Sequence, residues 1–245
     1  MIETAGLTKV FDGTVAVDHL DLTVEPGEIV GLVGINGAGK TTFLRMLAGI
    51  IQPTEGTIVI AGHALEGDAV KARAELAFVP DTPMLFDSLT VLEHLVFVAE
   101  LYGVNDREAR FDALLAEFDL TERRHATASS LSRGMRQKLA ICCAFLHDPV
   151  ALLLDEPLTG LDPPGRKRMA RAIQTRAAAG SAVIISSHQL DFVEKLCTRV
   201  AIVHTGQLRL SGTLAELQEQ ADHDGGTLED VFLSAIGATE DGSHS

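Results

Sequence analysis

Short apolar runs of strand length recur along the chain. Such runs, bounded by turn residues, are typical of strands in the interior of a sheet. The sequence predicts strands at residues 28–33, 56–62, 76–80, 151–154 and 183–185. A further stretch, 200–212, predicts a β-hairpin with its turn near Thr205 and Gly206.

Helical patterns lie between these strands. Apolar residues at helical spacing predict a helix over 43–48. Thr90 and Glu93 form a capping box before a long helical run. A third helix is expected to begin after Asp162, where a proline follows a capping residue, and to end at Gly180.

This alternation predicts an α/β fold with a mostly parallel central sheet and an antiparallel β part. Residues 83–146 are the exception, because their pattern is helical throughout and contains no strong strand. We therefore expect a helical subdomain inserted between two strands of the sheet.

Length and composition fit a folded protein. The 245 residues suffice for one large domain or two small ones, and 46% of them are hydrophobic. The longest apolar run, residues 139–146, is far shorter than the roughly 20 residues that span a membrane. No secretory leader is visible at the N-terminus, so we expect a cytoplasmic protein. Cys142, Cys143 and Cys197 fit neither a disulfide framework nor a zinc site and are expected to be buried free thiols.

The formal net charge is −14, which argues against a protein that binds nucleic acid through bulk charge. The acidic residues concentrate near the C-terminus, because the stretch 213–245 contains eight of them and no Lys or Arg. We expect a solvated end, partly disordered over the last ten residues.

A glycine-rich turn follows the first apolar strand. Residues 34–41, GINGAGKT, match G-x-x-x-x-G-K-[ST], with a predicted strand before them and a helix after them. Glycines in this arrangement let backbone N–H groups surround phosphate oxygens. Lys40 can then reach the β- and γ-phosphates of a nucleotide, and the hydroxyl of Thr41 can ligate Mg²⁺.

Two acids follow the strand at 151–154. Asp155 stands at the carboxyl end of this strand, where α/β sheets place their ligands, and it is the expected second metal ligand. Glu156 comes next and is expected to face a different part of the same site.

Ser132 begins the stretch SRGM before a further helix. A serine here is a good N-cap, but a helix N-terminus also favours anions. Ser132 could therefore be a cap, a phosphate ligand, or each in turn.

Taken together and in order, these segments resemble the nucleotide-binding subunit of an ABC transporter, from about residue 2 to residue 212. GINGAGKTT resembles the Walker A motif, and LLLDEP resembles the Walker B motif followed by a glutamate. LSRGM resembles the signature LSGGQ, Gly160-Leu161-Asp162 the D-loop, and Ser186-Ser187-His188 the switch histidine. Phe11 occupies the position of the aromatic residue that stacks on adenine.

The resemblance implies a P-loop NTPase (RecA-like) core that binds ATP and Mg²⁺. It assigns Glu156, His188 and Lys40 to catalysis, and Thr41, Asp155 and Asp81 to the metal. Asp162 would couple two copies of the chain. Nucleotide contacts would come from Phe11, Asn36, Gly37, Ala38, Gly39, Lys40, Thr41 and Thr42, and in trans from Ser132 and Gly134 of a second subunit.

Some assignments keep an alternative. Phe11 could be a core aromatic residue, and His188 could cap the helix that follows it. Asp81 stands where the family usually has glutamine, and sometimes glutamate, which puts the usual role of that position in question. Arg133 and Met135 also depart from the common signature.

The resemblance further implies an ATPase domain over residues 1–215 and an acidic extension over 216–245. It implies a homodimer of the ATPase and a separate integral-membrane permease, which would hold the chain on the inner face of the cell membrane. A short helix of the permease would enter a groove at residues 81–89, where Met84, Leu85 and Phe86 could instead pack inward.

Features such as residues 78–95, the methionine of the signature and the segment 228–232 resemble export-type subunits. Two other functions remain open: a soluble ABC-type ATPase that is not coupled to transport, and a nucleotide switch of low turnover.

Overall fold

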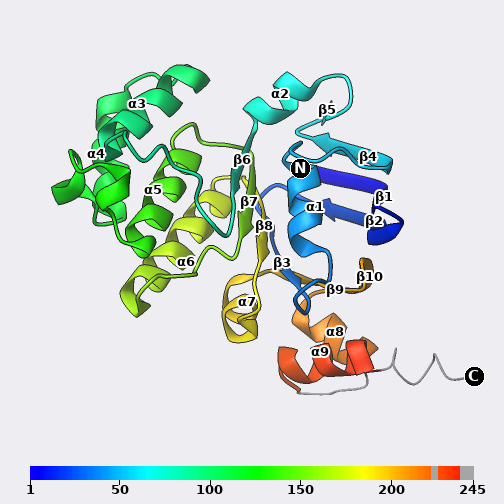
Figure 1. The fold of residues 1–245 in the computed structure, drawn as a ribbon. Coiled ribbons are helices and arrows are strands. Elements are labelled where there is room, and N and C mark those ends of the chain that lie inside the picture. The colour runs from blue at the N-terminus through cyan, green and yellow to red at the C-terminus, as the bar shows by residue number, and fades with distance from the viewer. Residues whose placement is uncertain (222–225, 238–245) are drawn as a thin grey trace, which may run out of the picture.

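The molecule contains two β-sheets, the larger at its centre and the smaller at one side (Figure 1). The computed structural model describes residues 1–221 and 226–237. The smaller sheet is antiparallel and has the order β2 (Thr14–Val24), β1 (Ile2–Phe11), β4 (Glu55–Ile60), β5 (His63–Ala64). The larger sheet has the order β10 (Gln207–Gly212), β9 (Arg199–His204), β3 (Ile29–Val33), β8 (Ala182–Ser186), β7 (Ala151–Asp155), β6 (Leu76–Val79).

All neighbouring strands of the larger sheet are parallel except β10, which pairs antiparallel with β9 at one edge. Every residue of β3, β7 and β8 is buried, because helices or the second sheet cover both faces. The predicted α/β fold with a mostly parallel sheet and an antiparallel part is confirmed.

Two turns show how local sequence sets the strand ends. Thr205 (φ 49°) and Gly206 (φ 80°) connect β9 to β10 in the left-handed region, as a two-residue hairpin requires, and this confirms the predicted turn. The strand expected over 56–62 is wrong at both ends: β4 begins at Glu55 and stops at Ile60. It stops there because Ala61 (φ 52°) and Gly62 (φ 79°) turn the chain into β5.

The helical subdomain lies beside the larger sheet (Figure 1) and contains α3 (Val91–Tyr102), α4 (Arg107–Glu117) and α5 (Arg133–Phe145), with short 3-10 turns at Thr121–Arg123 and Ala128–Ser130. Residues 83–146 contain no strand, as expected. The capping box of Thr90 and Glu93 is present at the start of α3. Phe111, Leu115 and Phe145 belong to the same buried apolar cluster as Leu152 and Leu154 of β7, so the insert and one face of the sheet share a core.

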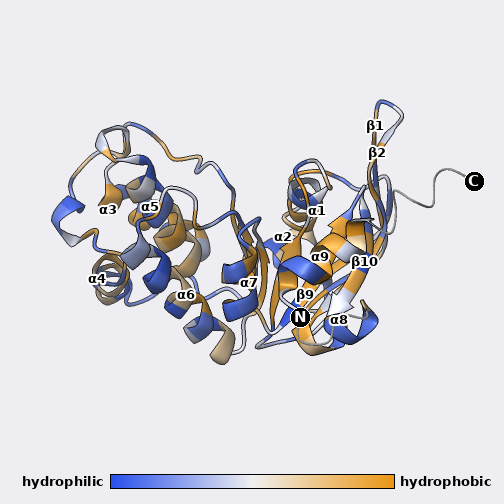
Figure 2. Cartoon of the chain, turned by 90° about the horizontal axis from the view of Figure 1, so that it is seen from below, coloured by the Kyte–Doolittle hydropathy of each residue, from blue (hydrophilic) through white to orange (hydrophobic). Residues whose placement is uncertain are grey.

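The remaining helices surround the sheets. They are α1 (Lys40–Leu47), α2 (Ala69–Ala74), α6 (Pro163–Ala178), α7 (Leu190–Leu196), α8 (Leu214–Gln220) and α9 (Leu228–Gly237). Figure 2 shows apolar strands in the interior and helices with mixed surfaces outside them. Helix α1 starts three residues earlier than the predicted helix, directly at the end of the glycine-rich turn. Among the described residues, none of the helices has the length and apolar character needed to span a membrane.

The C-terminal helices pack onto β9 and α7. Leu217 of α8 and Leu228 and Val231 of α9 are fully buried in one cluster with Val193 and Ile202. The domain boundary predicted after residue 215 falls within α8. Of the last ten residues, 238–245 lie outside the described residues, while Ile236 and Gly237 end α9.

The three cysteines are free, as predicted, but only Cys142 is fully buried, whereas Cys143 and Cys197 are partly buried. Burial raises the pKa of the Cys143 and Cys197 thiols to about 12 and that of Cys142 well above its usual range. They are therefore neutral thiols at physiological pH, and only the thiolate form of cysteine is strongly nucleophilic.

Candidate nucleotide site

The glycine-rich turn joins β3 to α1. Gly39 has φ 103°, and a Cβ atom added to it would lie 2.4 Å from the carbonyl oxygen of Ala16. A Cβ on Gly34 would lie 2.4 Å from the carbonyl oxygen of Val203. Both positions thus admit only glycine unless the neighbouring backbone shifts, which explains the glycines at the two ends of the motif.

The β9–β10 hairpin holds the glycine-rich turn in place. The N–H of Gly206, in the β9–β10 turn, donates to the carbonyl of Ala38 (3.0 Å), and the carbonyl of Gly206 accepts from the N–H of Asp18 in β2 (2.9 Å). The turn is therefore tied by backbone hydrogen bonds to strands of both sheets.

A cavity of about 280 Å³ lies over the turn. It brings together residues 36–41 of the turn and all three carboxylates that were predicted for the site. Its lining consists of Ala16, Asn36, Gly37, Ala38, Gly39, Lys40, Thr41, Thr42, Asp81, Asp155 and Glu156. It does not include Phe11, Ser132, Gly134 or His188.

Lys40 lies at the floor of this cavity with only 8% of its surface exposed. Its ammonium group donates to the carbonyl oxygens of Gly34 and Ile35. Burial lowers the pKa of Lys40, and the nearby charges of Glu156 and Asp155 oppose that shift. An ammonium group has three N–H donors, so one remains for an anion in the cavity.

Asp155 has one carboxylate oxygen bonded and one without a partner. Oδ1 accepts from the hydroxyl of Ser186 at the end of β8, whereas Oδ2 is buried and has no hydrogen-bond partner among the described residues. Buried carboxylate oxygens are normally satisfied. Because Thr41 lines the same cavity, these two side chains fit a hard divalent cation that takes oxygen ligands.

Glu156 leaves the strand in a left-handed backbone conformation, with φ 48°. Its N–H donates to both the carbonyl and the hydroxyl oxygen of Ser186, at 3.1 Å each, which stabilises a conformation that non-glycine residues rarely adopt. Adjacent carboxylates therefore point in different directions, as expected. Sequence reasoning named Ser186 only as the first residue of the segment that ends in His188, and it missed the role of the Ser186 hydroxyl.

His188 contacts Glu156. Its Nδ1 lies 2.9 Å from Oε1 of Glu156, and since an ionised carboxylate can only accept, Nδ1–H is the donor. Helix α7 has Gln189 at its N-cap and no side-chain cap, so the alternative in which His188 caps this helix is wrong. The histidine is mostly exposed and the glutamate mostly buried, at 62% and 20% side-chain exposure.

The start of α5 carries Ser132 and Gly134. The hydroxyl of Ser132 accepts from the N–H of Met135 (3.3 Å), so Ser132 is the N-cap in this structure. A Cβ on Gly134 would lie 2.4 Å from the carbonyl oxygen of Gly160, which places the helix start against the loop before α6. Asp162 in that loop caps α6 by accepting from the N–H of Gly165 (3.1 Å).

Phe11 ends β1 with 43% of its surface exposed, so the alternative of a core aromatic residue is wrong. The ammonium group of Lys9 lies 4.9 Å from the centre of its ring. Its predicted stacking on adenine stays a prediction.

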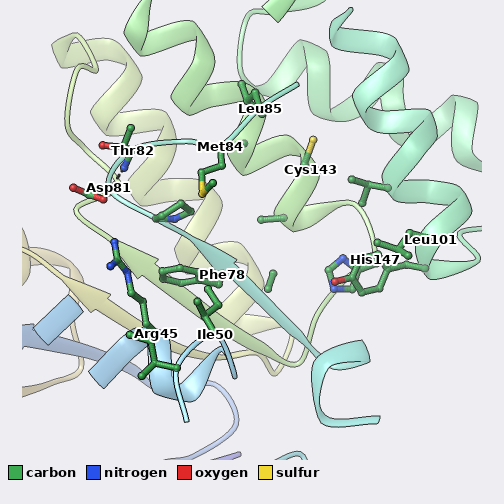
Figure 3. Close-up of a pocket in the computed structure, with 17 residues that line it drawn as sticks. Arg45, Ile50, Phe78, Asp81, Thr82, Met84, Leu85, Leu101, Cys143 and His147 are labelled. Atoms are coloured by element: carbon green, nitrogen blue, oxygen red, sulfur yellow. Dashed lines mark hydrogen bonds between the residues drawn. The ribbon is translucent and has the colours of Figure 1, made fainter. Parts of the chain in front are cut away.

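A second, larger hollow of about 900 Å³ lies between the helical subdomain on one side and α1 and β6 on the other (Figure 3). We call it the insert groove. Its lining includes Ile50, Phe78, Met84, Leu101, Tyr102 and His147. Asp81 lines both the insert groove and the cavity over the glycine-rich turn.

Met84, Leu85 and Phe86, which could have packed inward, do not share one environment. Met84 is 93% exposed and Phe86 56%, whereas Leu85 is partly buried against the core that the insert shares with the sheet. Phe86 rests edge-on against Phe97 of α3, with ring centres 5.6 Å apart.

Comparisons with known proteins agree on one family. A family model described as "ABC transporter" matches residues 17–159. The chain is 35% identical over 246 residues to the "ABC-type transporter ATP-binding protein EcsA" of Bacillus subtilis (strain 168), covering 100% of this chain and 99% of that protein. It is 34% identical to the "Probable multidrug ABC transporter ATP-binding protein YbhF" of Escherichia coli (strain K12), over 96% of this chain and 42% of that protein.

A solved structure entitled "Structure of ATP binding subunit of ABC transporter" superimposes with a TM-score of 0.93 at 32% identity, over 96% of this chain and 99% of that one. The match covers both sheets and the helical subdomain.

Proposed function

This chain belongs to the ABC transporter family as an ATP-binding protein, and from that premise we propose that it hydrolyses ATP in a nucleotide-sandwiched dimer to drive export through a separate membrane permease. The glycine-rich turn and Lys40 bind the phosphates, and Phe11 packs on the adenine. Support comes from the exposure of Phe11 and from the one N–H donor of Lys40 that makes no hydrogen bond to the turn.

Thr41 and Asp155 hold Mg²⁺ in this proposal. The metal would neutralise charge on the phosphate oxygens during hydrolysis. Support comes from the unpartnered Oδ2 of Asp155 in a cavity that Thr41 also lines. Asp81 has one oxygen occupied by the N–H of Thr82 (2.8 Å), and its other oxygen is available to the metal shell or to water.

Glu156 orients and polarises the attacking water, and His188 positions this carboxylate and contacts the γ-phosphate. Support comes from the 2.9 Å contact between the two side chains and from the strained backbone that turns Glu156 toward the cavity. Most of the rate enhancement then comes from positioning and charge stabilisation, as is general for phosphoryl transfer.

A second copy of the chain completes the site. Ser132 and Gly134 do not line the cavity of their own chain, yet they carry bare N–H groups and the positive end of a helix dipole. We propose that they bind the γ-phosphate held by the other subunit, and that Asp162 couples the two sites. Ser132 would exchange its capping bond for this contact.

One observation carries the proposal: the P-loop residues, the unsatisfied Asp155 and the Glu156 carboxylate face a single cavity. Replacing Glu156 with Gln keeps the shape and removes the charge that attracts the proton of water. The kcat of ATP hydrolysis should fall by at least about 100-fold, the range for loss of a general base.

The same variant should bind ATP and Mg²⁺ and accumulate as a dimer, which light scattering after size exclusion would detect. Unchanged turnover would reject Glu156 as the base. A chain that neither binds ATP nor dimerises would reject the proposed function as a whole.

The permease would dock in the insert groove and hold the chain on the inner face of the membrane. Support comes from the apolar lining of the groove and the exposure of Met84 and Phe86 beside it. Asp81 lines both this groove and the cavity over the glycine-rich turn. Docking of the permease could therefore affect the catalytic site through this one residue. Support for export comes from the resemblance to YbhF, whose name describes a probable multidrug transporter.

Asp81 favours one second candidate, a nucleotide switch of low turnover, because a carboxylate stands where the family usually has an amide. Steady-state turnover of the purified dimer decides between them. Sustained hydrolysis supports the transporter ATPase, and a single turnover followed by a stable complex supports the switch.

A further inference from the structure

The stretch next to the insert groove is hydrogen-bonded to the segment that precedes α5. The carbonyl of Asp87 accepts from the N–H of Ser129 (3.2 Å), and the carbonyl of Leu89 accepts from the N–H of Ala128 (2.9 Å). Thr90 and Thr127 form an isolated β-bridge between the same two segments. A displacement of residues 87–90 must therefore move the backbone just before Ser132 or break these bonds.

Arg136 fastens the same region to the first turn of α5. Its Nη1 donates to Oδ1 of Asp87 (2.8 Å) and to the carbonyl of Ala128 (2.8 Å). Its backbone N–H donates to the carbonyl of Ser132 (2.9 Å). One arginine thus connects the stretch beside the groove, the segment before the helix and the helix start.

The pair differs from an ordinary surface ion pair. Exposed pairs contribute little because water and salt screen them. Here the arginine side chain is only 25% exposed and its guanidinium group also donates to a backbone carbonyl, while the Asp87 side chain is 71% exposed. The arginine is therefore held by two acceptors and joins the exposed Asp87 to the segment before α5.

We infer that Arg136, through Asp87, is the positioning residue that sets the orientation of Ser132 and Gly134 according to the state of the insert groove. The inference rests on the proposed function, in which these two residues bind ATP in trans. Neither Arg136 nor Asp87 lines the insert groove or the cavity over the glycine-rich turn.

The start of α5 also contacts the loop before α6. Gly134 lies against the carbonyl of Gly160, two residues before Asp162, so a tilt of α5 reaches the loop proposed to couple the two subunits. A double-mutant cycle measures whether Arg136 and Asp87 act as one energetically coupled pair, which their proximity alone does not show.

The test uses the full chain carrying Glu156→Gln, with ATP and Mg²⁺ as the probe. Adding Arg136→Ala should weaken ATP-dependent dimerisation by about tenfold, and ATP binding by the monomer should stay unchanged because the second half-site acts in trans. A tenfold change equals about 1.4 kcal/mol. Arg136→Lys keeps the charge and should recover part of the loss.

Arg110→Ala is the matched control. Arg110 lies in the same subdomain, and its Nη1 likewise bridges a carboxylate, Asp148, and a backbone carbonyl, that of Leu146. It lies at the other end of the insert and should leave dimerisation unchanged.

Asp87→Ala removes the contact from the exposed side and should weaken dimerisation as Arg136→Ala does, with no further loss in the double variant. This second variant keeps the test valid if Arg136→Ala does not fold. The inference is overturned if Asp87→Ala dimerises as tightly as Arg110→Ala, or if monomeric ATP affinity falls in parallel. If the Glu156→Gln parent itself fails to dimerise, the proposed function is overturned first.

Discussion

At the scale of single residues, the site depends on backbone geometry as much as on side-chain chemistry. Asp155 and Glu156 are adjacent, yet one is buried at a strand end and the other turns toward the contact with His188, because φ is positive at Glu156. The hydroxyl of Ser186 bonds both residues and holds this divergence. The sequence motif identified the two acids. The residue that holds them apart is Ser186, which comes from the neighbouring strand β8.

Gly134 gives a residue-scale prediction. In Gly134→Ala the new Cβ would lie 2.4 Å from the carbonyl oxygen of Gly160, so the start of α5 or the loop must shift. We expect ATPase activity to fall about tenfold or more and stability to fall by about 1–3 kcal/mol, the usual cost of overpacking. Turnover assays and urea unfolding would measure both.

Gly237→Ala is the control, since no described residue lies within 4 Å of a Cβ at that position. Equal activity of the two variants would contradict the close packing of α5 against the loop before α6.

At the scale of secondary-structure elements, the sequence predicted strands and helices correctly where apolar residues were regularly spaced. The buried strands β3, β7 and β8 are short continuous apolar runs, and the capping residues Thr90 and Asp162 start their helices as expected. Strands β1 and β2, over residues 2–24, were not predicted from the sequence. Strand β1 pairs with β2 through three register shifts, which interrupt the alternation that marks a half-buried strand.

Helix α9 gives an element-scale prediction. Leu228 is fully buried against α7 and β9, and its N–H donates to the carboxylate of Glu194 in α7 (3.3 Å). Leu228→Ala should weaken the packing of α8 and α9 by about 2–5 kcal/mol. Hydrogen exchange should then speed up in these two helices while β3 and β8 keep their protection.

Leu233→Ala tests the same helix from its other face. Leu233 is 55% exposed, so its truncation should change exchange very little. A similar effect of both substitutions would show that helix content, and not the buried contact, holds α9.

At the scale of the whole molecule, the insert and the sheet enclose a groove that neither forms alone. Its lining draws on α1 and β6 of the core and on α3 and α5 of the insert (Figure 3). Several apolar residues along it remain exposed, among them Ile50, Met84, Leu101 and Tyr102. A contiguous apolar surface of this kind is typical of an interaction site.

Met84 gives the prediction at this scale. Met84→Asp places a charge in the groove at a side chain that is 93% exposed, so the melting temperature should not change. Recovery of an integral-membrane partner from detergent-solubilised membranes should fall strongly, because a buried unpaired charge at an interface is costly.

Val70→Asp is the matched variant, with a residue 83% exposed on α2 that does not line the groove. Recovery of the same partner with both variants would reject the groove as the docking site, and recovery of ribosomes alone would favour a soluble ATPase.

Several features could be read from the amino-acid pattern: the fold class, the glycine-rich turn, Lys40, Thr41, and the order of Asp155 and Glu156. These features are local: a strand, a turn and a helix start specify them within a few residues, so their pattern is readable without any partner segment. The folded chain was needed to see which side chains meet across long separations in sequence. The contact of His188 with Glu156, the bonds of Ser186 and the link between Asp87 and Arg136 join residues 30 or more positions apart. Such contacts depend on strand order and helix packing, which bring distant segments together and leave no periodic mark along the chain.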